Sequence, residues 1–425
     1  MFLVPLAVII TFGLEKSRKI SCPTPARILN PLKTFSLRLL FLLSSTICTW
    51  AADDTGPGNL YYVDVNRGSD SNPGTAEAPF QSVAKALLKV GAGDAIKLVK
   101  ADQPIPLMIN IRNKSGEPGK PIILDGQGNT LTGAVPIDPA DWVQEQPGLF
   151  SNDHLYKFLK PGDKGSSGAL IQRVYFLFDG QQNRMGRSSK GKQTHLPPAS
   201  SLSDGQWTYE ESSAKFYLKI DPAKTLADYK IEVPLREDGI AVRDTCENLI
   251  IRNFDVTHVW NDGFNLHGQT RHIVFENITA TECGDDGISE HEGCEMTIHG
   301  FTARRNSTGM CDGDDCISTA DHVVLEDNYA FNVLQRNGTH IFMDSSISAA
   351  APEGGYGGIC LNNVSTPSST GPSTVKFVRC HIPFPTGANP NGRPPFYAHA
   401  AVALDLTDCT LDGPVIRSET MGEAK

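Results

Sequence analysis

The sequence predicts an all-β fold, a solenoid in which a single chain winds through short parallel strands lap after lap. Its repeat is anchored on aspartates followed by Gly or Cys, with steps of 24, 24 and 29 residues between Asp238, Asp262, Asp286 and Asp315. Between the anchors stand apolar runs such as "NLIIRNFDV" and "HIVFENITA", and no helix-period segment intervenes to make βαβ units. Parallel strands joined by such short turns must wind, which stacks equivalent residues about 4.8 Å apart.

The chain divides into five stretches around this repeat. The first reads as an export segment, because two short apolar runs precede small residues that suggest cleavage near Ala51 or Ala52. Both runs are shorter than the roughly 18 residues that a membrane span needs, so we expect a secreted, periplasmic or cell-surface protein with no span in the mature chain. The expected boundaries are 1–52 for the export segment, 58–133 for the N-terminal cap and first coils, 134–235 for a β-rich insertion, 236–417 for the main coils and 418–425 for a tail.

The cap begins with a strand at Tyr61–Val65, continues with an amphipathic helix at Ser82–Val90, and returns to a strand at Ala95–Val99. The motifs "GSDSNPGT", "APF" and "GAGD" punctuate these elements. This opening resembles that of many secreted right-handed parallel β-helix proteins of the pectin-lyase-like type. The resemblance implies a single-stranded right-handed parallel β-helix whose N-terminal end is closed by a short capping helix.

The insertion contains "DGQWTYEESSAKFYLKI", which predicts a hairpin of two aromatic-rich strands. Two roles are open for this stretch. It either pads the side of the solenoid or exposes Trp and Tyr rings that stack on the apolar faces of sugars.

Charge and cysteine content exclude several classes of partner. A net charge of −10 and a pI near 5.6 argue against nucleic acid and anionic membrane surfaces as partners. We expect the protein to be a monomer.

The ten cysteines lack the CxxC spacing of zinc sites. Cys283 and Cys311 precede anchors on adjacent laps, so stacking predicts that they lie within disulfide reach. Cys360, Cys380 and Cys409 recur near strand ends, which indicates a buried thiol ladder.

Stacking also predicts a polar stripe along the solenoid. Strand alternation places Arg243, His267 and His291 on the outer face beside the anchor carboxylates. A single Asp-Gly per lap suits a turn, because Asp bonds its own backbone and Gly accepts left-handed torsions. Doubled acids are harder to explain as turns, since stacked carboxylates repel, raise one another's pKa or recruit a cation. The doubled acids are Asp285 with Asp286, and Asp312 with Asp314 and Asp315.

The motifs "NDGFN", "GDDGIS" and "GDDCIS" are similar to those of the polygalacturonase family. There, Asn-x-Asp on one coil and Asp-Asp on the next supply three catalytic carboxylates. The resemblance implies that Asn261 and Asp262 match the first element and that Asp285 and Asp286 match the second. In such hydrolases an acid protonates the leaving oxygen while a base activates water. The Gly-His-Gly and Arg-x-Lys motifs of that family are absent here.

The stretch "SEHEG" resembles the Glu-x-Glu calcium ligands of some β-helix polysaccharide lyases, with Glu290 and Glu292 at the matching positions. Such enzymes neutralise a uronate carboxylate with Ca²⁺ or Arg and remove the adjacent proton with a Lys, Arg or His base.

We therefore expect an exported protein that binds an extracellular polysaccharide and cleaves it by glycosidase-like acid/base chemistry. A Ca²⁺-dependent lyase and a non-catalytic binding or structural solenoid remain alternatives. The hydrolase mechanism requires no cofactor, whereas a Ca²⁺ site is expected to use Glu290 with Asp314 and Asp315. The expected catalytic residues are Asp262, Asp285 and Asp286, and the expected substrate contacts are Asn261, His267, His291 and Arg243.

Overall fold

The computed structural model describes residues 58–156, 159, 171–186, 189–190, 196–350, 358–362, 373–386 and 393–419. The expected export segment and the end of the expected tail lie outside these residues. Within the described ranges, no helix is long and apolar enough to cross a membrane.

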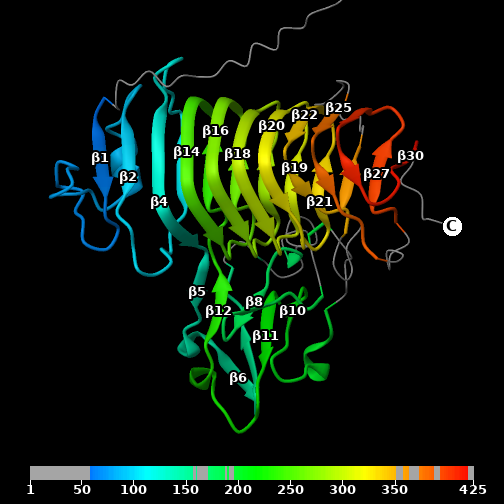
Figure 1. Ribbon diagram of the computed structural model, residues 1–425. Helices are drawn as coiled ribbons and strands as arrows, with labels where there is room; N and C mark the ends of the chain where they lie inside the picture. The colour runs from blue at the N-terminus through cyan, green and yellow to red at the C-terminus, as the bar shows by residue number, and fades with distance from the viewer. Residues whose placement is uncertain are drawn as a thin grey trace, which may run out of the picture. The chain divides into compact units, whose positions relative to one another are not determined.

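Two long parallel sheets dominate the described chain (Figure 1). The main path of the first, sheet A, consists of β1 (Leu60–Val63), β2 (Ala95–Leu98), β4 (Ile122–Thr132), β14 (Thr245–Thr257), β16 (Gln269–Thr281), β18 (Glu295–Arg304), β20 (Ile317–Leu325), β22 (Gly338–Met343), β25 (Ser373–Val378) and β28 (Ala403–Thr407). Three short strands extend it: β23 (Ser346–Ile347), β26 (His381–Ile382) and β29 (Thr410–Leu411). The second, sheet B, consists of β3 (Ile109–Arg112), β13 (Ile240–Arg243), β15 (Phe264–Leu266), β17 (Asp286–Glu290), β19 (Thr308–Asp312), β21 (Phe331–Gln335), β24 (Ile359–Leu361), β27 (Phe396–His399) and β30 (Ile416–Ser418).

From β13 to β22 the chain alternates between the sheets, so that one lap is a strand of sheet B followed by a strand of sheet A. Each strand pairs in parallel with the equivalent strand of the next lap. The prediction of a mostly β fold built from stacked parallel strands is confirmed.

The register of sheet B corrects one part of the predicted repeat. Ile240 pairs with Phe264 and Phe264 with Ile288, so these two laps have the equal length that the aspartate anchors predict. Ile288 then pairs with Met310, which makes the next lap shorter, and Asp286 faces Thr308 rather than Asp315. The prediction aligned the motif at Asp286 with a similar motif at Asp315, although the two motifs lie at different points of the lap. "GDDGIS" runs into β17, whereas "GDDCIS" covers the turn after β19, where Asp314 and Asp315 have φ of 58° and 63°.

The core lies between the two sheets and is made of the inward-facing residues of every lap. Phe264 of sheet B packs edge-on against Phe275 of sheet A, with ring centroids 5.5 Å apart. At the N-terminal end, helix α1 (Val83–Leu87) packs against this core through Val83 and Ala86. The hydroxyl of Ser82 caps it by accepting a hydrogen bond from Lys85 N at 3.1 Å. The predicted helix is present but shorter than its predicted span.

The predicted disulfide between Cys283 and Cys311 is wrong. Cys311 pairs in register with Ser289, and both cysteines are free and buried. Cys283 N instead donates a hydrogen bond to Asn306 Oδ1 at 2.8 Å. The disulfide prediction used the same misplaced lap as the predicted Asp315 column. In the predicted thiol ladder, Cys380 N lies 3.4 Å from Cys409 Sγ.

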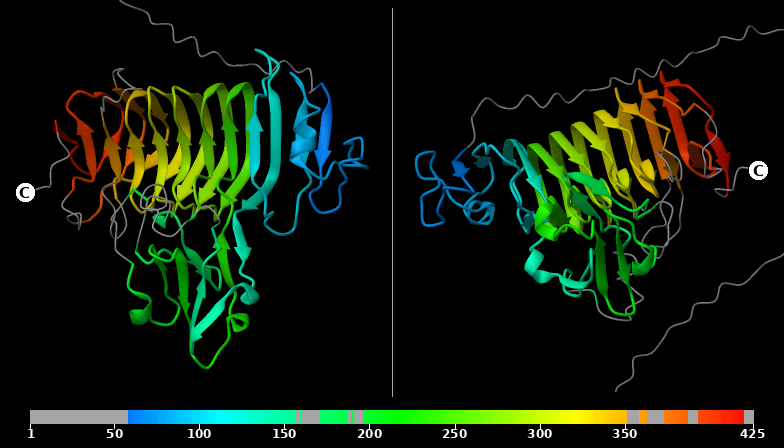
Figure 2. Two further views of the ribbon diagram at one scale, coloured as in Figure 1. Left: turned by 180° about the vertical axis from the view of Figure 1, so that it is seen from behind. Right: turned by 90° about the horizontal axis from the view of Figure 1, so that it is seen from below.

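The insertion folds as a lobe beside the long sheets (Figures 1 and 2). It contains two antiparallel sheets and its own apolar cluster. The first sheet is β10 (Trp207–Glu210), β11 (Lys215–Lys219), β7 (Leu149–Asn152) and β6 (Val143–Gln146). The second is β5 (Ala134–Pro136), β12 (Ile231–Pro234), β8 (Phe176–Phe178) and β9 (Gln181–Asn183). Short 3₁₀ turns lie at Pro139–Asp141, Ala199–Ser201 and Leu226–Asp228.

The predicted hairpin is β10 paired with β11. Its Trp207 is fully buried and donates from Nε1 to Asn183 O at 2.9 Å, and Tyr209 is buried beside Phe216. These two rings belong to the core of the lobe, so neither serves as an exposed platform for a sugar.

Peptide mapping tests the cysteine assignment. After unfolding and alkylation without a reductant, both Cys283 and Cys311 are expected to carry the alkyl group, because each is a free thiol in the fold. A peptide pair linked through these two residues, lost on reduction, would contradict the observed register.

Candidate functional site

Three buried carboxylates come together where two neighbouring laps enter sheet B. Asp262, Asp285 and Asp286 are each at most 4% exposed, and each offers an oxygen within 4.8 Å of the others. Asp262 lies just before β15, and Asp286 opens β17 one lap later. The parallel pairing of β15 with β17 therefore brings the predicted catalytic group together.

Two members of the aspartate column hold the backbone of the following lap. Asp238 Oδ1 accepts a hydrogen bond from Asp262 N at 3.3 Å, and Asp262 Oδ1 accepts one from Asp286 N at 2.9 Å. Asp238 also accepts from Arg243 Nη2 at 2.6 Å, and Asp262 accepts from the hydroxyl of Ser289 at 2.8 Å. Asp238 is therefore structural, but the turn explanation is wrong for it, because its carboxylate binds the next lap and Arg243 and Gly239 is not among the glycines with positive φ.

Asp286 breaks this pattern. Its two oxygens accept from Lys190 Nζ, at 2.6 Å and 2.5 Å. The same ammonium donates to Asp285 Oδ1 at 2.9 Å, and Arg173 Nη2 lies 2.7 Å from Asp285 Oδ2. Ser189 also donates its hydroxyl to Asp285. Asp285 and Asp286 are thus paired with cations from the lobe, whereas Asp238 and Asp262 bind the next lap.

These contacts separate the pKa values of the three carboxyls. Burial acts to raise the pKa of Asp285, but Lys190 and Arg173 outweigh it and hold the pKa at about 2. Burial, with the negative charge of Asp285, raises the pKa of Asp286 to about 6. The pKa of Asp262 is raised well above its usual range by burial and by the charges of its neighbours. The cluster therefore combines one ionised carboxylate with two carboxyls that hold protons more tightly, which is the distribution that acid/base catalysis requires.

Lys190 is poorly suited to act as a base in this state. Burial disfavours its charged form, but Asp285 and Asp286 more than compensate and raise its pKa well above the usual value. It remains an ammonium near neutral pH and cannot accept a proton.

The lobe also fixes the backbone that carries Asp285. Tyr175 Oη and Gln182 Nε2 both donate to the carbonyl oxygen of Glu282. Arg184, buried between the rings of Tyr175 and Tyr329, donates to the carbonyl oxygens of Cys283 and Gly284. Only glycine fits at position 284, because a Cβ there would overlap the carbonyl oxygens of Trp260 and Arg173.

An open cavity of about 400 Å³ adjoins the carboxylates. Apart from Gly268, its lining residues have polar or charged side chains, which suits a ligand rich in hydroxyl groups. Arg173 and Asn261 belong to both the cavity and the carboxylate cluster, and the guanidinium of Arg173 donates to Asn261 Oδ1. The lining residues are Arg112, Arg173, Glu237, Arg243, Asp244, Asn261, Asn265, His267, Gly268 and Glu292.

The two predicted histidines stack on one another at this side of the fold. The rings of His267 and His291 lie 4.5 Å apart at an angle of 18°. Burial lowers the pKa of His267, and burial together with His267 lowers that of His291 to about 3. Both imidazoles are therefore neutral near pH 7 and are suited to hydrogen bonding. Arg243, the fourth expected substrate contact, lines the cavity while bound to Asp238.

The expected Ca²⁺ ligands do not come together in the described structure. Glu290 is fully buried and shares its group of ligand atoms with Asp312 and His340. Asp314 and Asp315 lie in the turn after β19 and belong to neither group of ligand atoms found among the described residues. That donor set therefore does not fit a Ca²⁺ ion.

Sequence reasoning missed Arg173, Ser189 and Lys190. They lie in the insertion, outside the repeat, so stacking could not assign them. For Ser189 and Lys190, the available signal was the basic stretch "RSSKGK" in an acidic chain.

Comparisons with known proteins identify no family. No protein-family model matches the chain, and a search of curated proteins finds no match. Among solved structures, the complex of XylC with xylose is 11% identical and covers 82% of this chain and 69% of its own, at a TM-score of 0.44. A structure described as a glycoside hydrolase is 9% identical, covers 85% and 96%, and has a TM-score of 0.47. Pectate lyase Pel9A is 14% identical, covers 85% and 82%, and has a TM-score of 0.44.

Unfolding of two isosteric variants tests whether Asp238 and Asp286 contribute equally to stability. Asp238→Asn is expected to lower the free energy of unfolding by about 2–4 kcal/mol, because it leaves the guanidinium of Arg243 without its buried carboxylate. Asp286→Asn is expected to change it by less than about 1 kcal/mol, because the substitution also removes repulsion from Asp285. Denaturant titration measures both. Equal losses would mean that Asp286 is as structural as Asp238.

Proposed function

We propose that this protein is an exported carbohydrate-active enzyme that hydrolyses glycosidic bonds of an extracellular polysaccharide. The observation that carries the proposal is that Asp285 and Asp286 are buried together and that Arg173 and Lys190 of the lobe contact Asp285. These contacts hold the pKa of Asp285 at about 2, while burial and Asp285 raise that of Asp286 to about 6. Glycoside hydrolysis needs such a pair, one carboxyl to protonate the leaving oxygen and one to assist or make the attack. The hydrophilic cavity beside the pair is suited to sugar hydroxyls.

In this mechanism Asp286 is the general acid and Asp285 is the carboxylate that acts on water or on the sugar. Asp262 supports the pair, since it binds Asp286 N and holds its own proton tightly. Arg173 and Lys190 keep Asp285 ionised. Asn261, Arg243 and the stacked imidazoles of His267 and His291 are assigned to substrate binding.

We also propose that the two sheets form one right-handed parallel β-helix, acting as a monomer. The alternation of the chain between sheets A and B supports a helical winding. The right hand follows the strong preference of crossovers between parallel strands. Export of the chain, with cleavage near Ala51 or Ala52, belongs to the same proposal.

A Ca²⁺-dependent polysaccharide lyase is the second candidate. It is favoured by the oxygen atoms of Asp262, Asp285 and Asp286, which lie within 4.8 Å of one another, a donor set that hard cations accept. There Ca²⁺ would replace Lys190 and neutralise the carboxylate of a uronate substrate. Against it stands the raised pKa of Lys190, which makes the nearest amine a poor base.

An activity screen decides between these functions. The protein is incubated with neutral, uronate and sulfated polysaccharides, with EDTA or with Ca²⁺. New reducing ends without the ultraviolet absorbance of unsaturated uronates are expected.

Asp286→Asn is expected to lower turnover at least about 10³-fold, because it removes the proton donor. Asp255→Asn, on β14 of sheet A, serves as the matched control. Unsaturated products would indicate the lyase, and silence on every substrate by folded protein would indicate a binding or structural solenoid.

The pH profile tests the assignment of the acid. Because Asp286 must be protonated to donate, kcat/KM is expected to fall about tenfold per pH unit above pH about 6. Lys190→Met is expected to move this fall to higher pH, since Lys190 opposes the rise in the pKa of Asp286. A profile that instead rises through pH 6 would assign Asp286 the role of a base.

A further inference from the structure

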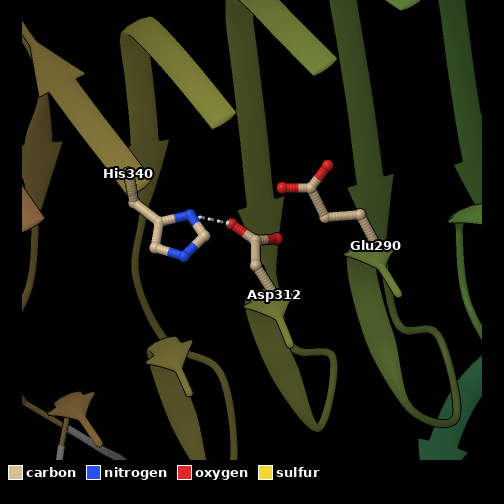
Figure 3. Close-up of side chains that lie close together, drawn as sticks. All are labelled: Glu290, Asp312 and His340. Carbon is tan, nitrogen blue, oxygen red and sulfur yellow. Dashed lines mark ion pairs between the residues drawn. The ribbon is translucent and has the colours of Figure 1, made fainter. Parts of the chain in front are cut away.

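A second group of titratable side chains lies inside the fold, away from the proposed catalytic site. Glu290 ends β17, Asp312 ends β19 and His340 lies on β22 of sheet A. All three are fully buried, and each offers a ligand atom within 4.8 Å of the others. Figure 3 shows the carboxylate of Glu290 and the ring of His340 directed toward Asp312 from opposite sides.

Lap-to-lap pairing shows how unusual these residues are at their position. Five successive pairings define one column of sheet B. It is apolar before and after the cluster, with Val242 and Leu266 on one side and Leu361 on the other. The three intervening laps carry Glu290, Asp312 and Gln335. An aliphatic side chain at Glu290 would continue the core, so the acid is not needed for packing.

The cluster has more acceptors than donors. Both oxygens of Glu290, Oδ1 of Asp312 and Oε1 of Gln335 are buried and, among the described residues, lack a hydrogen-bond partner. The available donors converge on Asp312 Oδ2, which accepts from Gln335 Nε2 at 2.9 Å and from Ser318 Oγ at 2.9 Å. Within the described part of the chain, no group donates to the carboxylate of Glu290.

The tautomer of His340 adds a further acceptor. Its Nε2 lies 2.7 Å from the carbonyl oxygen of Asn337, which can only accept, so Nε2 carries the hydrogen. In a neutral imidazole Nδ1 then presents a lone pair, 3.2 Å from Asp312 Oδ2. Ser318 has one hydroxyl hydrogen and cannot satisfy both Nδ1 and Asp312. A ring nitrogen aimed at carboxylates, with the other nitrogen bound to a backbone carbonyl, is the usual arrangement of a metal-ligating histidine.

A proton does not resolve this arrangement as well as a cation does. If Glu290 carried a proton, its carbonyl oxygen would still lack a donor among the described residues. Asn306 in the same core shows what a satisfied interior amide looks like. Its Nδ2 donates to Ala280 O and to Asn328 Oδ1, both at 3.0 Å.

We propose that Glu290, Asp312 and His340 bind a divalent cation inside the core, between sheets A and B. The two carboxylates balance its charge, and the mixed oxygen and nitrogen donors favour a transition-type ion, with Zn²⁺ as the probe. Gln335, whose Nε2 binds Asp312 Oδ2, carries an unpaired Oε1 that is available as a fourth donor. The ion links β17 and β19 of sheet B to β22 of sheet A. This inference does not rest on the proposed catalytic function.

Metal content tests the proposal directly. The full chain is expressed in medium supplemented with Zn²⁺, purified without chelator, and measured by elemental analysis and native mass spectrometry. About one zinc ion per chain is expected in the wild type and in Glu276→Gln, a control on the outer face of β16. Glu290→Leu and Glu290→Gln are expected to retain less than about a tenth of this. Asp286→Asn is expected to keep its zinc, which separates this site from the catalytic carboxylates.

Thermal unfolding provides a second readout. Because the ligands are fully buried, zinc is removed by unfolding in EDTA and restored during refolding. With free Zn²⁺ at about a hundred times its Kd, the refolded, zinc-loaded wild type is expected to melt about 3–5 °C above the metal-free form. Glu290→Leu is expected to show no such difference and to match or exceed the metal-free wild type, since leucine continues the apolar column. Wild-type protein without any bound metal, or Glu290→Leu with its metal content unchanged, would overturn the proposal.

Discussion

Parallel pairing at a constant register is the constraint on which the rest of this structure depends. It places equivalent residues of successive laps one strand spacing apart, so any charged residue that recurs at one position meets its counterpart at about 4.8 Å. Apolar residues benefit from this repetition, as Phe264 and Phe275 do in the core. Repeated acids do not, because like charges at that distance repel and burial increases the repulsion.

The fold handles its repeated polar positions in different ways. Asp238 and Asp262 each accept the backbone N–H of the next lap, so these carboxylates strengthen the winding. His267 and His291 avoid repulsion by staying neutral and stacking. Asp285 and Asp286 are bound by cations from outside the repeat. In the column of Glu290 and Asp312, Asp312 Oδ2 has side-chain partners but both oxygens of Glu290 lack one among the described residues, which is why a cation is proposed there.

The lobe turns a repetitive surface into a specific site. Without Arg173 and Lys190, three buried acids would all be driven toward the protonated form. With them, Asp285 stays ionised while Asp286 retains a pKa of about 6. The lobe also binds the backbone carbonyls of Glu282, Cys283 and Gly284, so its position and the geometry of the acids are mechanically linked. Such preorganisation of charge in a site with little solvent is a main source of catalytic power in enzymes generally.

The sequence by itself determined the parallel strands, the stacked aspartate column and the meeting of Asp262 with Asp285 and Asp286. Laps of equal length leave little freedom in how successive strands align, so local pattern was sufficient there. The local pattern failed where the lap became shorter. The motif at Asp314 and Asp315 has the sequence of an anchor but lies in the turn after β19. Similar motifs do not reveal their register, which depends on pairing across the whole sheet.

Only the tertiary structure decided which acids bind the next lap and which are paired with cations of the lobe. Asp238 and Asp286 stand in equivalent positions and in similar sequence, yet one binds Arg243 and the next lap while the other binds Lys190. That difference comes from a residue of the lobe, far away in the chain and without a repeat to locate it. In the same way, His340 joins Glu290 only because sheets A and B face each other across the core. Contacts between unrelated segments depend on packing in three dimensions, and the spacing of residues along the chain does not encode them.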